Sequence, residues 1–565
     1  MQSRPFSFRT RKKSLERFKK EVFDLLVIGG GITGAAVARD ATSRGLKVAL
    51  VERSDFAYGT SSRSSKLIHG GLRYLENFEI GLVFEALAER AQLLKTAPYR
   101  VRPLPFFLPV YQGDTHGRGL LGLGLWLYDF LSLFRTPQFH KNLSKKKLLE
   151  EIPFLESQKL LGGFRYFDAS MWDDLLTVET LRSAQEAGAA VANYVEALSP
   201  LWNQGQISGF VLRDVENPEN HFEIQAHRTV SCVGPWTDQL GLQVSRQWKN
   251  CLKPSKGVHL VFDLERIPIP GALVMSHPQD GRIVFVVPRA DLGAGVVIVG
   301  TTDAPASIDP EQSQVTRLDV EYLLGLLEKY FPSLKLKAQD ILSAYVGVRP
   351  LWDEGLRSAT TLQKVSREHS ITDGPGGMVI VVGGKYTTHR SMAQEIVDFI
   401  LTSWKRDQNQ SGVPPYPRVR IGASQTRAPV NPQATREAIA RCQAQLQHPF
   451  ENPKIPEQLW SRYGAEAIGF KSLDIKTGKQ LEDPPGFPWI EAQLRYAIQS
   501  EMVIHLEDFY LRRVPLYTAR KDHGLPWAES LSTVWAQENG VGEHEKQVEL
   551  QRLYQECARR SAWSE

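Results

Sequence analysis

The chain contains little cysteine. Four cysteines occur in 565 residues, at positions 232, 251, 442 and 557, and no two form a C-x-x-C pair. This spacing excludes a disulfide framework and a zinc ribbon, and it favours free thiols in a reducing compartment. A large charge excess is also absent, because the net charge is only +5.

What basicity there is lies at the N-terminus. The first 20 residues hold eight basic residues and one acidic residue, which leaves 60 basic and 62 acidic residues for the rest of the chain. A nucleic-acid-binding surface over the whole protein is therefore excluded. We expect residues 1–21 to be a solvated basic arm. A mitochondrial-type targeting segment and an arm near an anionic membrane are the alternatives.

Long apolar runs are missing as well. No segment offers about 18 uncharged apolar residues, so no transmembrane helix is expected. The nearest is 119–134, GLLGLGLWLYDFLSLF, which contains Asp129. We favour a buried helix of the core. The alternative is a helix in a membrane interface, with Trp126, Tyr128 and Phe130 at the lipid headgroups.

A glycine-rich loop is the strongest local motif. Residues 25–28 are a continuous apolar run, as in a buried parallel strand, and Gly29-x-Gly31-x-x-Gly34 follows. This spacing predicts a tight turn, close approach of a pyrophosphate, and a helix from Thr33 to residue 44 that packs on the strand. A second strand, 47–51, ends at Glu52, whose carboxylate can accept hydrogen bonds from a ribose and would repel a 2′-phosphate.

The dinucleotide is predicted to be FAD rather than NAD(P). The motif lies near the start of the chain, and no second G-x-G-x-x-G unit follows for a nicotinamide nucleotide. Residues 229–236, TVSCVGPW, form an apolar strand that ends in Gly-Pro and can return beside the dinucleotide. Together these features indicate a flavoenzyme.

A second motif, GTSSRSSKLIHGGLRYLE, covers residues 59–76. Its hydroxyls, its charged side chains and the Gly70-Gly71 pair suit a loop that approaches a flat ligand closely. With VGPW, SKGVHLVF at 255–262, VGTTD at 299–303, VGVRPL at 346–351 and GGKYTTHR at 383–390, it occurs in family order. On these motifs residues 23 to about 400 resemble the FAD-dependent, quinone-linked glycerol-3-phosphate dehydrogenases, and the C-terminal part resembles them more loosely.

The resemblance implies two sets of site residues. Its substrate-binding residues are Arg73, Tyr74, His259, Arg349, Arg367 and Lys385, of which His259, Arg349 and Lys385 are expected to be catalytic. Together with the glycine loop, the expected FAD-binding residues are Gly29, Gly31, Thr33, Gly34, Glu52, Arg53, Thr60, Ser61, Ser65, Lys66, Leu67, His69, Gly71, Gly234, Trp236, Gly384, Lys385 and Thr387.

These residue types suit oxidation of glycerol 3-phosphate. Guanidinium groups can bind its phosphate in a bidentate manner, and a lysine near the flavin can stabilise negative charge on the reduced ring. His259, on an apolar strand, is the expected general base, because a pKa near ~6.5 leaves a neutral imidazole at working pH. A histidine that only packs in the core is the alternative.

Other charged groups have structural interpretations. Asp173 and Asp174 are expected to cap the helix that follows them, and Asp168 is not expected to form a reactive pair with Asp173. His69 is expected to support the loop at residues 59–76, called the flavin loop below because the resemblance places it against the flavin. Glu501, His505, Glu507 and Asp508 indicate a solvated face or an interdomain contact rather than a metal site, and neither a metal nor a calcium loop is expected.

The predicted fold class is α/β: a Rossmann-type FAD-binding fold resembling that of glutathione reductase, interleaved with a β-rich substrate-binding domain and followed by a helical C-terminal domain. The oxidoreductase region spans 22–404, with FAD-binding segments at about 22–100, 160–245 and 340–400 and a substrate-binding sheet mainly at about 250–350. A linker, 405–420, precedes the helical domain at 421–565.

The resemblance implies a dehydrogenase that converts glycerol 3-phosphate to dihydroxyacetone phosphate and passes electrons to membrane quinone. Alternatives are an oxidase that uses oxygen, an amine or amino-acid oxidase on the same fold, and a flavin-binding sensor without turnover. We expect a cytoplasmic protein on the inner membrane surface, or on the mitochondrial inner membrane in a eukaryote. No nucleic-acid partner is expected, and a homodimer is compatible with the sequence.

Overall fold

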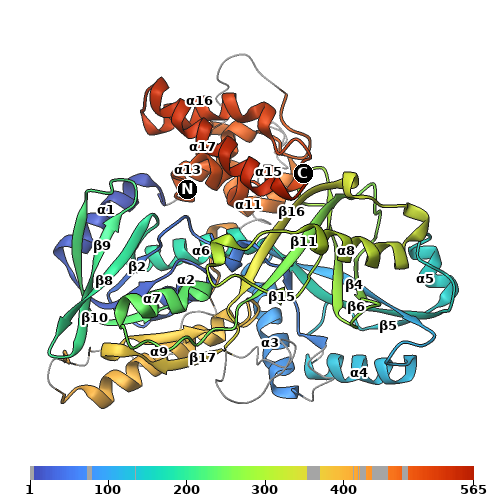
Figure 1. The fold of residues 1–565 in the computed structure, drawn as a ribbon, viewed down its shortest axis with the longest axis horizontal. Helices are drawn as coiled ribbons and strands as arrows, with labels where there is room; N and C mark the ends of the chain where they lie inside the picture. Colours follow the sequence, from blue (N-terminus) through green and yellow to red (C-terminus); the bar gives the residue numbers. More distant parts are fainter. Residues whose placement is uncertain are drawn as a thin grey trace, which may run out of the picture.

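The computed structural model describes residues 5–72, 79–133, 135–352, 369–410, 413–415, 417, 419, 428–435, 456–473 and 482–564. Two sheets lie side by side, and the C-terminal helices cover one end of both (Figure 1). The site lies where the first sheet meets the second.

The first sheet is built on parallel strands. In the described part of the chain its order is β17 (Ser370–Asp373), β18 (Val379–Val382), β10 (His221–Ser231), β1 (Val22–Ile28), β2 (Val48–Val51) and β7 (Ala190–Ala192). An antiparallel ribbon of β8 (Val195–Asn203) and β9 (Gln206–Asp214) joins it at β10. The sheet is therefore complete only when β10 pairs with β1 and β18 pairs with β10, and both of these strands lie far along the chain from β1.

Helices bury both faces of this sheet. Apolar side chains of α2 (Ile32–Ser43), α6 (Asp173–Glu186) and α9 (His389–Asp407) form one core with β1, β2 and β18. A second core joins α1 (Phe8–Lys20), α7 (Thr237–Val244) and the β8–β9 ribbon to the opposite face. Burial on both faces explains the continuous apolar runs of β1 and β2.

The second sheet takes strands from two distant stretches. Its order is β15 (Ala304–Pro305), β11 (Ser255–Asp263), β14 (Val296–Gly300), β13 (Ile283–Arg289), β12 (Ala272–Ser276), β4 (Val101–Tyr111), β6 (Leu160–Met171) and β3 (Leu67–Ile68). β16 (Ile341–Arg349) pairs with β11, and β5 (Lys141–Ser144) pairs with β6. The β-rich prediction for 250–350 is confirmed, and the sheet continues into 67–171, where no strands were predicted.

The remaining helices lie at the edges of the sheets and in the C-terminal part. They are α3 (Ile80–Thr96), α4 (Arg118–Leu131), α5 (Lys145–Glu151), α8 (Arg317–Tyr330), α11 (Glu457–Tyr463), α12 (Phe470–Leu473), α13 (Ile490–Ser500), α14 (Leu506–Asp508), α15 (Leu516–Ala519), α16 (Ala528–Asn539) and α17 (Glu543–Ser561). No helix among the described residues is long and apolar enough to cross a membrane.

The expectation of a solvated tail is wrong for residues 8–20. They form α1, and Leu15 and Phe18 of this helix are buried against the first sheet. Arg11 is also buried, where it donates to the carbonyl oxygen of Asn193 at 2.8 Å and pairs with Asp214 at 2.5 Å. A basic sequence folds here because a carboxylate and free carbonyls on the sheet compensate the buried guanidinium.

The expectation of a buried helix is wrong for most of α4. Only Leu125, Tyr128 and Asp129 are buried, through contacts with β6 and α3. Leu123 is 68% exposed and Trp126 is 62% exposed. The helix is apolar all round, but it lies at the edge of the second sheet and only one of its faces has a protein neighbour.

Candidate functional site

The glycine loop connects β1 to α2. Gly29 has φ +112°, and a Cβ there would lie 2.6 Å from the carbonyl oxygen of Cys232. A Cβ on Gly34 would lie 1.9 Å from the carbonyl oxygen of Gly29. The chain can therefore make this turn and pack α2 against it only with glycine at both positions, and the free N–H groups at the start of α2 suit a pyrophosphate.

Glu52 comes directly after β2 and lines a groove that the glycine loop also lines. Its Oε2 accepts from the backbone N–H of Gly30 at 2.7 Å, and its Oε1 accepts from that of Ser54 at 2.9 Å. Burial raises the pKa of Glu52, and the two backbone N–H groups oppose that rise. Each carboxylate oxygen retains acceptor capacity for a ribose hydroxyl.

The groove has a volume of about 300 Å³ and is assembled from distant segments. Its walls come from β1, the glycine loop and the loop after β2, from 195–197, from 232–243, and from 350 and 383–386. The glycine cradle and the Glu52 carboxylate in this lining fit a dinucleotide.

Eleven of the predicted cofactor residues line the groove. They are Gly29, Gly31, Thr33, Glu52, Arg53, Thr60, Ser61, Gly234, Trp236, Gly384 and Lys385. Gly34, Ser65, Lys66, Leu67, His69, Gly71 and Thr387 are not among the lining residues. The ammonium of Lys66 instead forms a buried ion pair with Asp173, and Ser65 contacts His259.

Several lining residues escaped the sequence interpretation. Val195, Glu196 and Ala197 begin β8, and Gln239 and Gln243 lie on α7. None belongs to a recognisable motif. The one available signal was the position of 195–197 directly after β7, at the same sheet edge as Glu52, whose backbone carbonyl accepts from the N–H of Val195 at 2.7 Å.

His259 lies on β11, in the second sheet. Its Nε2 is 2.8 Å from Ser65 Oγ, and its ring stacks on that of Tyr345 at 4.7 Å. Its Nδ1 is buried and has no hydrogen-bond partner among the described residues. Burial, followed by the charges of Arg349 and Lys66, lowers the pKa of His259 to about 3, so the expected pKa near 6.5 is too high for this buried imidazole.

Arg349 ends β16, beside the start of β11. Its guanidinium donates to Thr301 Oγ1 at 2.8 Å, to the Thr302 carbonyl oxygen at 3.2 Å and to Ser255 Oγ at 3.2 Å. The groove is close, because Pro350 lines it and Thr60 Oγ1 donates to the carbonyl oxygen of Val348 at 2.5 Å. The end of β16 therefore borders the groove, and hydrogen bonds hold the adjacent guanidinium in place.

Three of the predicted substrate residues, Arg73, Tyr74 and Arg367, lie outside the described residues. The other three, His259, Arg349 and Lys385, come from separate elements. Arg349 and His259 are close enough for the charge of one to lower the pKa of the other, and Lys385 lines the groove. The fold thus brings Arg349 close to His259 and places Lys385 on the groove wall.

Comparisons with known proteins agree with this geometry. Residues 24–398 match the family model described as FAD dependent oxidoreductase, and residues 422–546 match that described as C-terminal domain of alpha-glycerophosphate oxidase. An aerobic glycerol-3-phosphate dehydrogenase of Staphylococcus aureus (strain USA300) is 34% identical over 506 residues, which cover 89% of this chain and 88% of that protein. The chain belongs to the FAD-dependent glycerol-3-phosphate dehydrogenase family.

A solved member of this family extends the likeness to the whole fold. The glycerol-3-phosphate dehydrogenase from Bacillus halodurans, complexed with FAD, superposes with a TM-score of 0.76 at 29% identity and covers 98% of both chains. An L-alpha-glycerophosphate oxidase from Mycoplasma pneumoniae with FAD bound matches at a TM-score of 0.52 and 18% identity, over 67% of this chain and 95% of that one. The second likeness shows the fold alone.

Two predictions about carboxylates can be compared with the structure. Asp173 and Asp174 lie in the first turn of α6, one and two positions after Trp172, which occupies the N-cap position. Both carboxylates still bind N–H groups of that turn, since Asp173 accepts from Asp174 at 3.0 Å and Asp174 accepts from Leu175 at 2.7 Å. Asp173 also accepts from Ser64 Oγ at 2.6 Å and pairs with Lys66, which fixes the loop before β3. Asp168 is bound separately by Arg90 and Tyr128.

His505 makes the interdomain contact that one of the alternatives predicted. Its Nε2 is 2.9 Å from Glu216, at the end of the β8–β9 ribbon, and its Nδ1 is 3.1 Å from Glu549 on α17. The solvated alternative is wrong for His505 and Asp508, because both side chains are buried.

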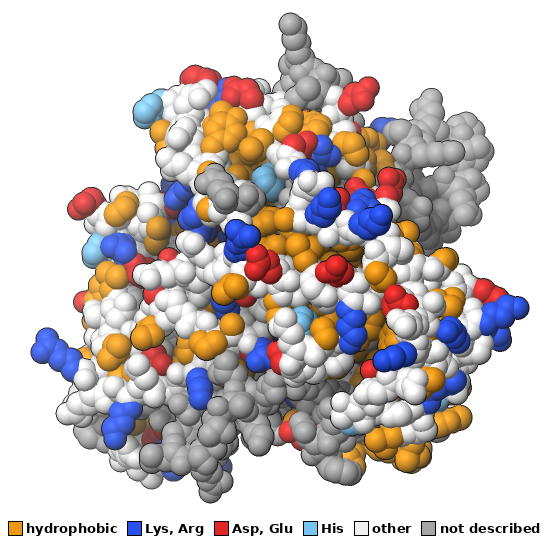
Figure 2. All heavy atoms as spheres, turned by 45° about the vertical axis from the view of Figure 1, so that its right-hand side comes forward, with side chains coloured by type: hydrophobic (Ala, Val, Ile, Leu, Met, Phe, Trp, Pro, Cys, Tyr) orange, Lys and Arg blue, Asp and Glu red, His pale blue; other side chains and the backbone are white. Residues whose placement is uncertain are grey.

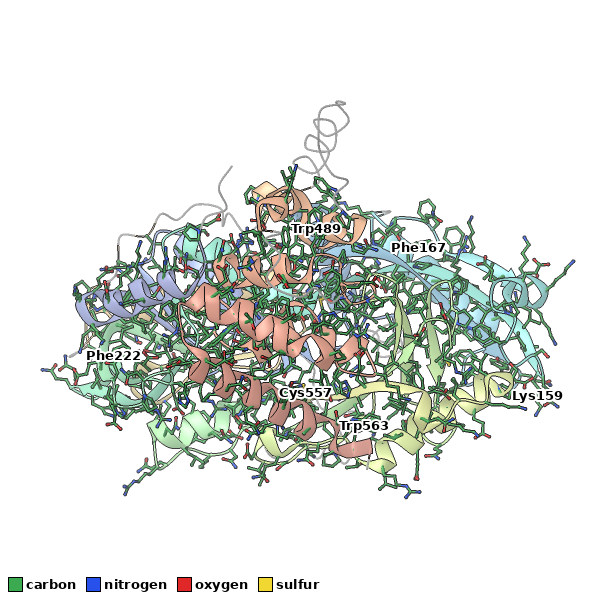
Figure 3. The ribbon with its side chains drawn as sticks, turned by 90° about the horizontal axis from the view of Figure 1, so that it is seen from above. Lys159, Phe167, Phe222, Trp489, Cys557 and Trp563 are labelled. Atoms are coloured by element: carbon green, nitrogen blue, oxygen red, sulfur yellow. The ribbon has the colours of Figure 1, made fainter. Side chains whose placement is uncertain are left out.

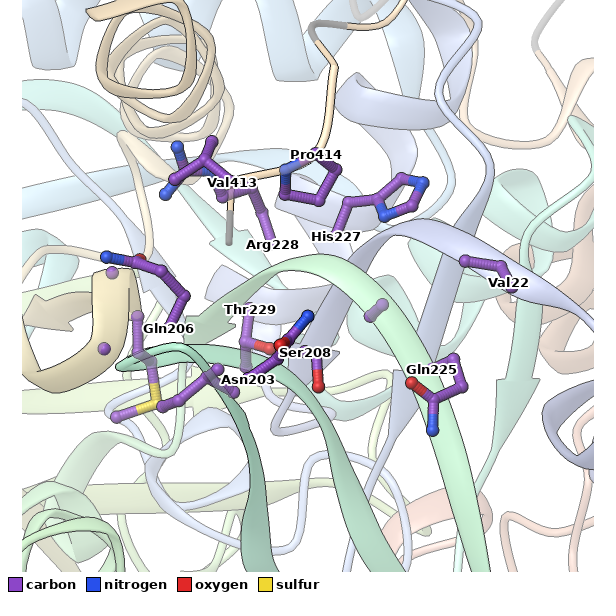
Figure 4. Close-up of a pocket in the computed structure, with 15 residues that line it drawn as sticks. Val22, Asn203, Gln206, Ser208, Gln225, His227, Arg228, Thr229, Val413 and Pro414 are labelled. Carbon is purple, nitrogen blue, oxygen red and sulfur yellow. The ribbon is translucent and has the colours of Figure 1, made fainter. Parts of the chain in front are cut away.

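A larger cavity, of about 390 Å³, lies at the opposite end of β1 (Figure 4). It is lined by Val22 and by side chains such as Gln206, Gln225 and Thr229. It lies far along β1 from the glycine loop, so the larger volume does not mark the flavin site.

Proposed function

We propose that this protein oxidises sn-glycerol 3-phosphate to dihydroxyacetone phosphate and passes the electrons to a membrane quinone. The observation that carries this proposal is the neutral, buried His259 with Arg349 close to it, in a chain of this family. Both adjoin the groove, because His259 contacts Ser65, next to Ser64 of the groove wall, and Arg349 precedes Pro350 of that wall. FAD, when bound, supplies the acceptor for the hydride that leaves C2 of the substrate.

Arg349 is proposed to bind the substrate phosphate. Thr301, Thr302 and Ser255 hold its guanidinium in place before substrate arrives. Little side-chain entropy is then lost on binding, and the planar group can make two parallel hydrogen bonds to phosphate oxygens. Lys385, and Arg73, Tyr74 and Arg367 outside the described residues, are proposed to complete the phosphate and flavin contacts.

His259 is proposed to take the proton of the C2 hydroxyl. In the tautomer that donates Nε2–H to Ser65, the lone pair of Nδ1 is available to accept it. A pKa of about 3 describes a weak base, but Arg349 contributes to that low value. A phosphate dianion on Arg349 offsets its charge, so substrate binding itself raises the base strength of His259.

The protein is further proposed to bind the membrane surface through α4. Exposed apolar side chains gather on this helix and around it, and Figure 2 shows hydrophobic side chains together at the lower right, below Lys and Arg side chains. Lys145, Lys146 and Lys147 are exposed at the start of α5, where they can contact anionic headgroups. The patch consists of Leu120, Leu123, Trp126, Leu127, Phe130, Leu133 and Phe139.

The buried side of α4 touches the flavin loop. The hydroxyl of Tyr128 accepts from the backbone N–H of Gly70 at 2.9 Å and donates to Asp168 at 2.9 Å. A membrane-bound α4 would therefore hold the flavin loop close to the lipid in which quinone dissolves. We propose a peripheral location on the inner membrane surface on this basis.

Domain boundaries and assembly belong to the same proposal. We propose an oxidoreductase region at 22–404, a linker at 405–420 and a helical domain at 421–565, which limited proteolysis tests by where the first cuts fall. A homodimer is the proposed assembly, and sedimentation velocity of the FAD-loaded protein tests it by its mass.

The decisive experiment is an anaerobic absorbance spectrum of the FAD-loaded protein before and after addition of glycerol 3-phosphate. Bleaching of the flavin bands is expected. Re-oxidation by a quinone analogue without peroxide would support the dehydrogenase, and stoichiometric peroxide in air would favour an oxidase. An intact flavin spectrum in the presence of substrate would refute the proposed activity.

Arg349→Ala tests the phosphate contact. We expect kcat/KM for glycerol 3-phosphate to fall by about a hundredfold or more, mainly through KM, because a charged hydrogen-bonding partner is lost. Arg317→Ala on α8 is the matched control, since Arg317 is 89% exposed and pairs only with Glu321 among the described residues. Unchanged kinetics of Arg349→Ala would remove this residue from the substrate site.

A further inference from the structure

A group of arginines lies behind the catalytic histidine, between the flavin loop and the C-terminal helices. Arg63 follows the short helix Thr60–Ser62, and α17 brings Arg559 and Arg560 over it. Figure 3 shows α17 from above, lying across the molecule with Cys557 and Trp563 at its C-terminal end. Two small cavities, of about 30 and 50 Å³, lie at this seam, and Arg63 and Arg560 line both of them.

The lining of these cavities is strongly cationic. Arg63, Lys66, Arg512, Arg559 and Arg560 line one or both, against the carboxylates of Asp174 and Glu311. Glu311 forms an ion pair with Arg53. Asp174 lines only the smaller cavity, where burial raises its pKa and the charge of Lys66 opposes that rise.

Most of these cations already have a partner. Lys66 pairs with Asp173, and Arg512 pairs with Asp55 and Asp508 at 2.6 Å each. Arg559 and Arg560 share a single carboxylate, that of Glu556.

Glu556 is 2.8 Å from Arg559 and 2.6 Å from Arg560, so one negative charge serves two positive ones. Arg63 has no carboxylate partner among the described residues, and its guanidinium lies over the ring of Tyr58 at 5.0 Å. Burial and the charge of Arg560 lower the pKa of Arg63 to about 10, so it remains charged near neutral pH. Around the larger cavity, Arg63, Arg559 and Arg560 therefore face only two of the described carboxylates, Glu556 and the Glu311 that is already paired with Arg53.

We infer that Arg63 and Arg560, assisted by Arg559, form a binding site for a small tetrahedral oxyanion such as inorganic phosphate. Guanidinium groups bind such ions through paired hydrogen bonds, and an uncompensated cluster of half-buried cations is stabilised by an anion between them. A cavity of about 50 Å³ admits an ion of this size and excludes a nucleotide.

The site is separate from the substrate site but shares a wall with it. Tyr345 lines both cavities, stacks on His259, and donates its hydroxyl hydrogen to the carbonyl oxygen of Ser64 at 2.9 Å. Because Ser65 contacts His259, an oxyanion on Arg63 would stabilise the loop that positions the catalytic base. The anion would also link α17 to this loop across the seam.

The test measures phosphate binding in the FAD-loaded Arg349→Ala protein, in which the proposed substrate site is weakened. Phosphate is titrated against chloride at constant ionic strength, and thermal unfolding is followed. A Tm rise that is specific to phosphate and saturates as one site is expected, since a ligand of the folded state stabilises it by mass action. Equal effects of phosphate and chloride would overturn the inference.

Second-site variants locate the effect. Adding Arg63→Ala should abolish the phosphate-dependent rise, and adding Arg560→Gln, which leaves the flavin loop intact, should reduce it at least tenfold in apparent affinity. Arg317→Ala is the matched control and should leave it unchanged. An undiminished phosphate-dependent Tm rise in both the Arg63 and the Arg560 variant would overturn the site. A Tm rise at lower concentrations of the bulkier glycerol 2-phosphate than of phosphate would overturn it as well.

Discussion

The helices α1 and α4 differ in composition, and each lies in surroundings opposite to those that its own composition predicts. The basic helix α1 packs into the first sheet and buries an arginine, whereas the apolar helix α4 exposes most of its large side chains. The difference lies in what faces each helix. Asp214 and two backbone carbonyl oxygens accept hydrogen bonds from Arg11. By contrast, α4 lies at a sheet edge, where only one of its faces packs against the rest of the described chain. Location therefore depends on complementary partners, which composition does not report.

The largest expected effect is on the α1 side. Arg11→Ala leaves Asp214 buried without its partner, and we expect the free energy of unfolding to fall by about 3–5 kcal/mol. Urea denaturation measures it. The double variant Arg11→Met/Asp214→Leu should recover part of the loss, because no uncompensated charge remains. A loss below about 0.5 kcal/mol in the single variant would mean that α1 is not held by this pair.

The segment that binds α1 through Asp214 also contacts His505 through Glu216, and this second contact makes the stability depend on pH. Burial alone would lower the pKa of His505, but hydrogen bonds with Glu216 and Glu549 outweigh it and raise that pKa to about 10. The stabilisation is complete below the unfolded value near ~6.5 and is lost as pH rises towards 10, by up to about 1.4 kcal/mol per pH unit. His505→Gln should flatten this decline in denaturation experiments between these pH values. Equal slopes in both proteins would contradict the raised pKa.

On the α4 side the effect should fall on lipid binding instead of stability. Leu123→Ser removes an apolar side chain that is 68% exposed, so we expect the free energy of unfolding to change by less than about 0.5 kcal/mol. Affinity for anionic vesicles should fall about tenfold, as measured by flotation. Leu318→Ser on α8 is the control, because Leu318 is 76% exposed outside the patch. Equal vesicle binding by both variants would exclude α4 as the contact.

The smallest effect is expected from the outer face of α1. Lys12→Gln and Lys13→Gln change exposed side chains, so stability should stay within about 0.5 kcal/mol. Figure 1 places α1 and α4 on different sides of the molecule, so vesicle binding should change by less than about twofold. A large drop in vesicle binding would show that α1 also contacts the membrane.

The nucleotide end of the fold was largely predictable. The predicted helix from Thr33 to residue 44 is observed as Ile32–Ser43. The strand before Gly234 returns beside the glycine loop, as expected, by pairing with β1. These features depend on local backbone requirements, such as a glycine that no other residue can replace. Local requirements are written in a few consecutive residues and can be read there.

The remaining features depend on distant partners. The strands in 67–171 pair with one another and with β12, and residues 195–197 reach the groove only through the sheet. The low pKa of His259 likewise arises from burial and from Arg349, 90 positions away in the sequence. Nothing in the residues beside His259 encodes that environment.

The interleaved groove has a consequence for the timing of synthesis. The glycine loop is complete at residue 34, but the groove closes only with residues 383–386. At about 5–20 residues per second, translation needs roughly 20–70 s to cover the interval between them. During that time the nascent chain carries a phosphate-binding turn without its opposite wall. Flavin loading is therefore a late event, and a ribosome that stalls before residue 383 leaves a chain that cannot enclose its cofactor.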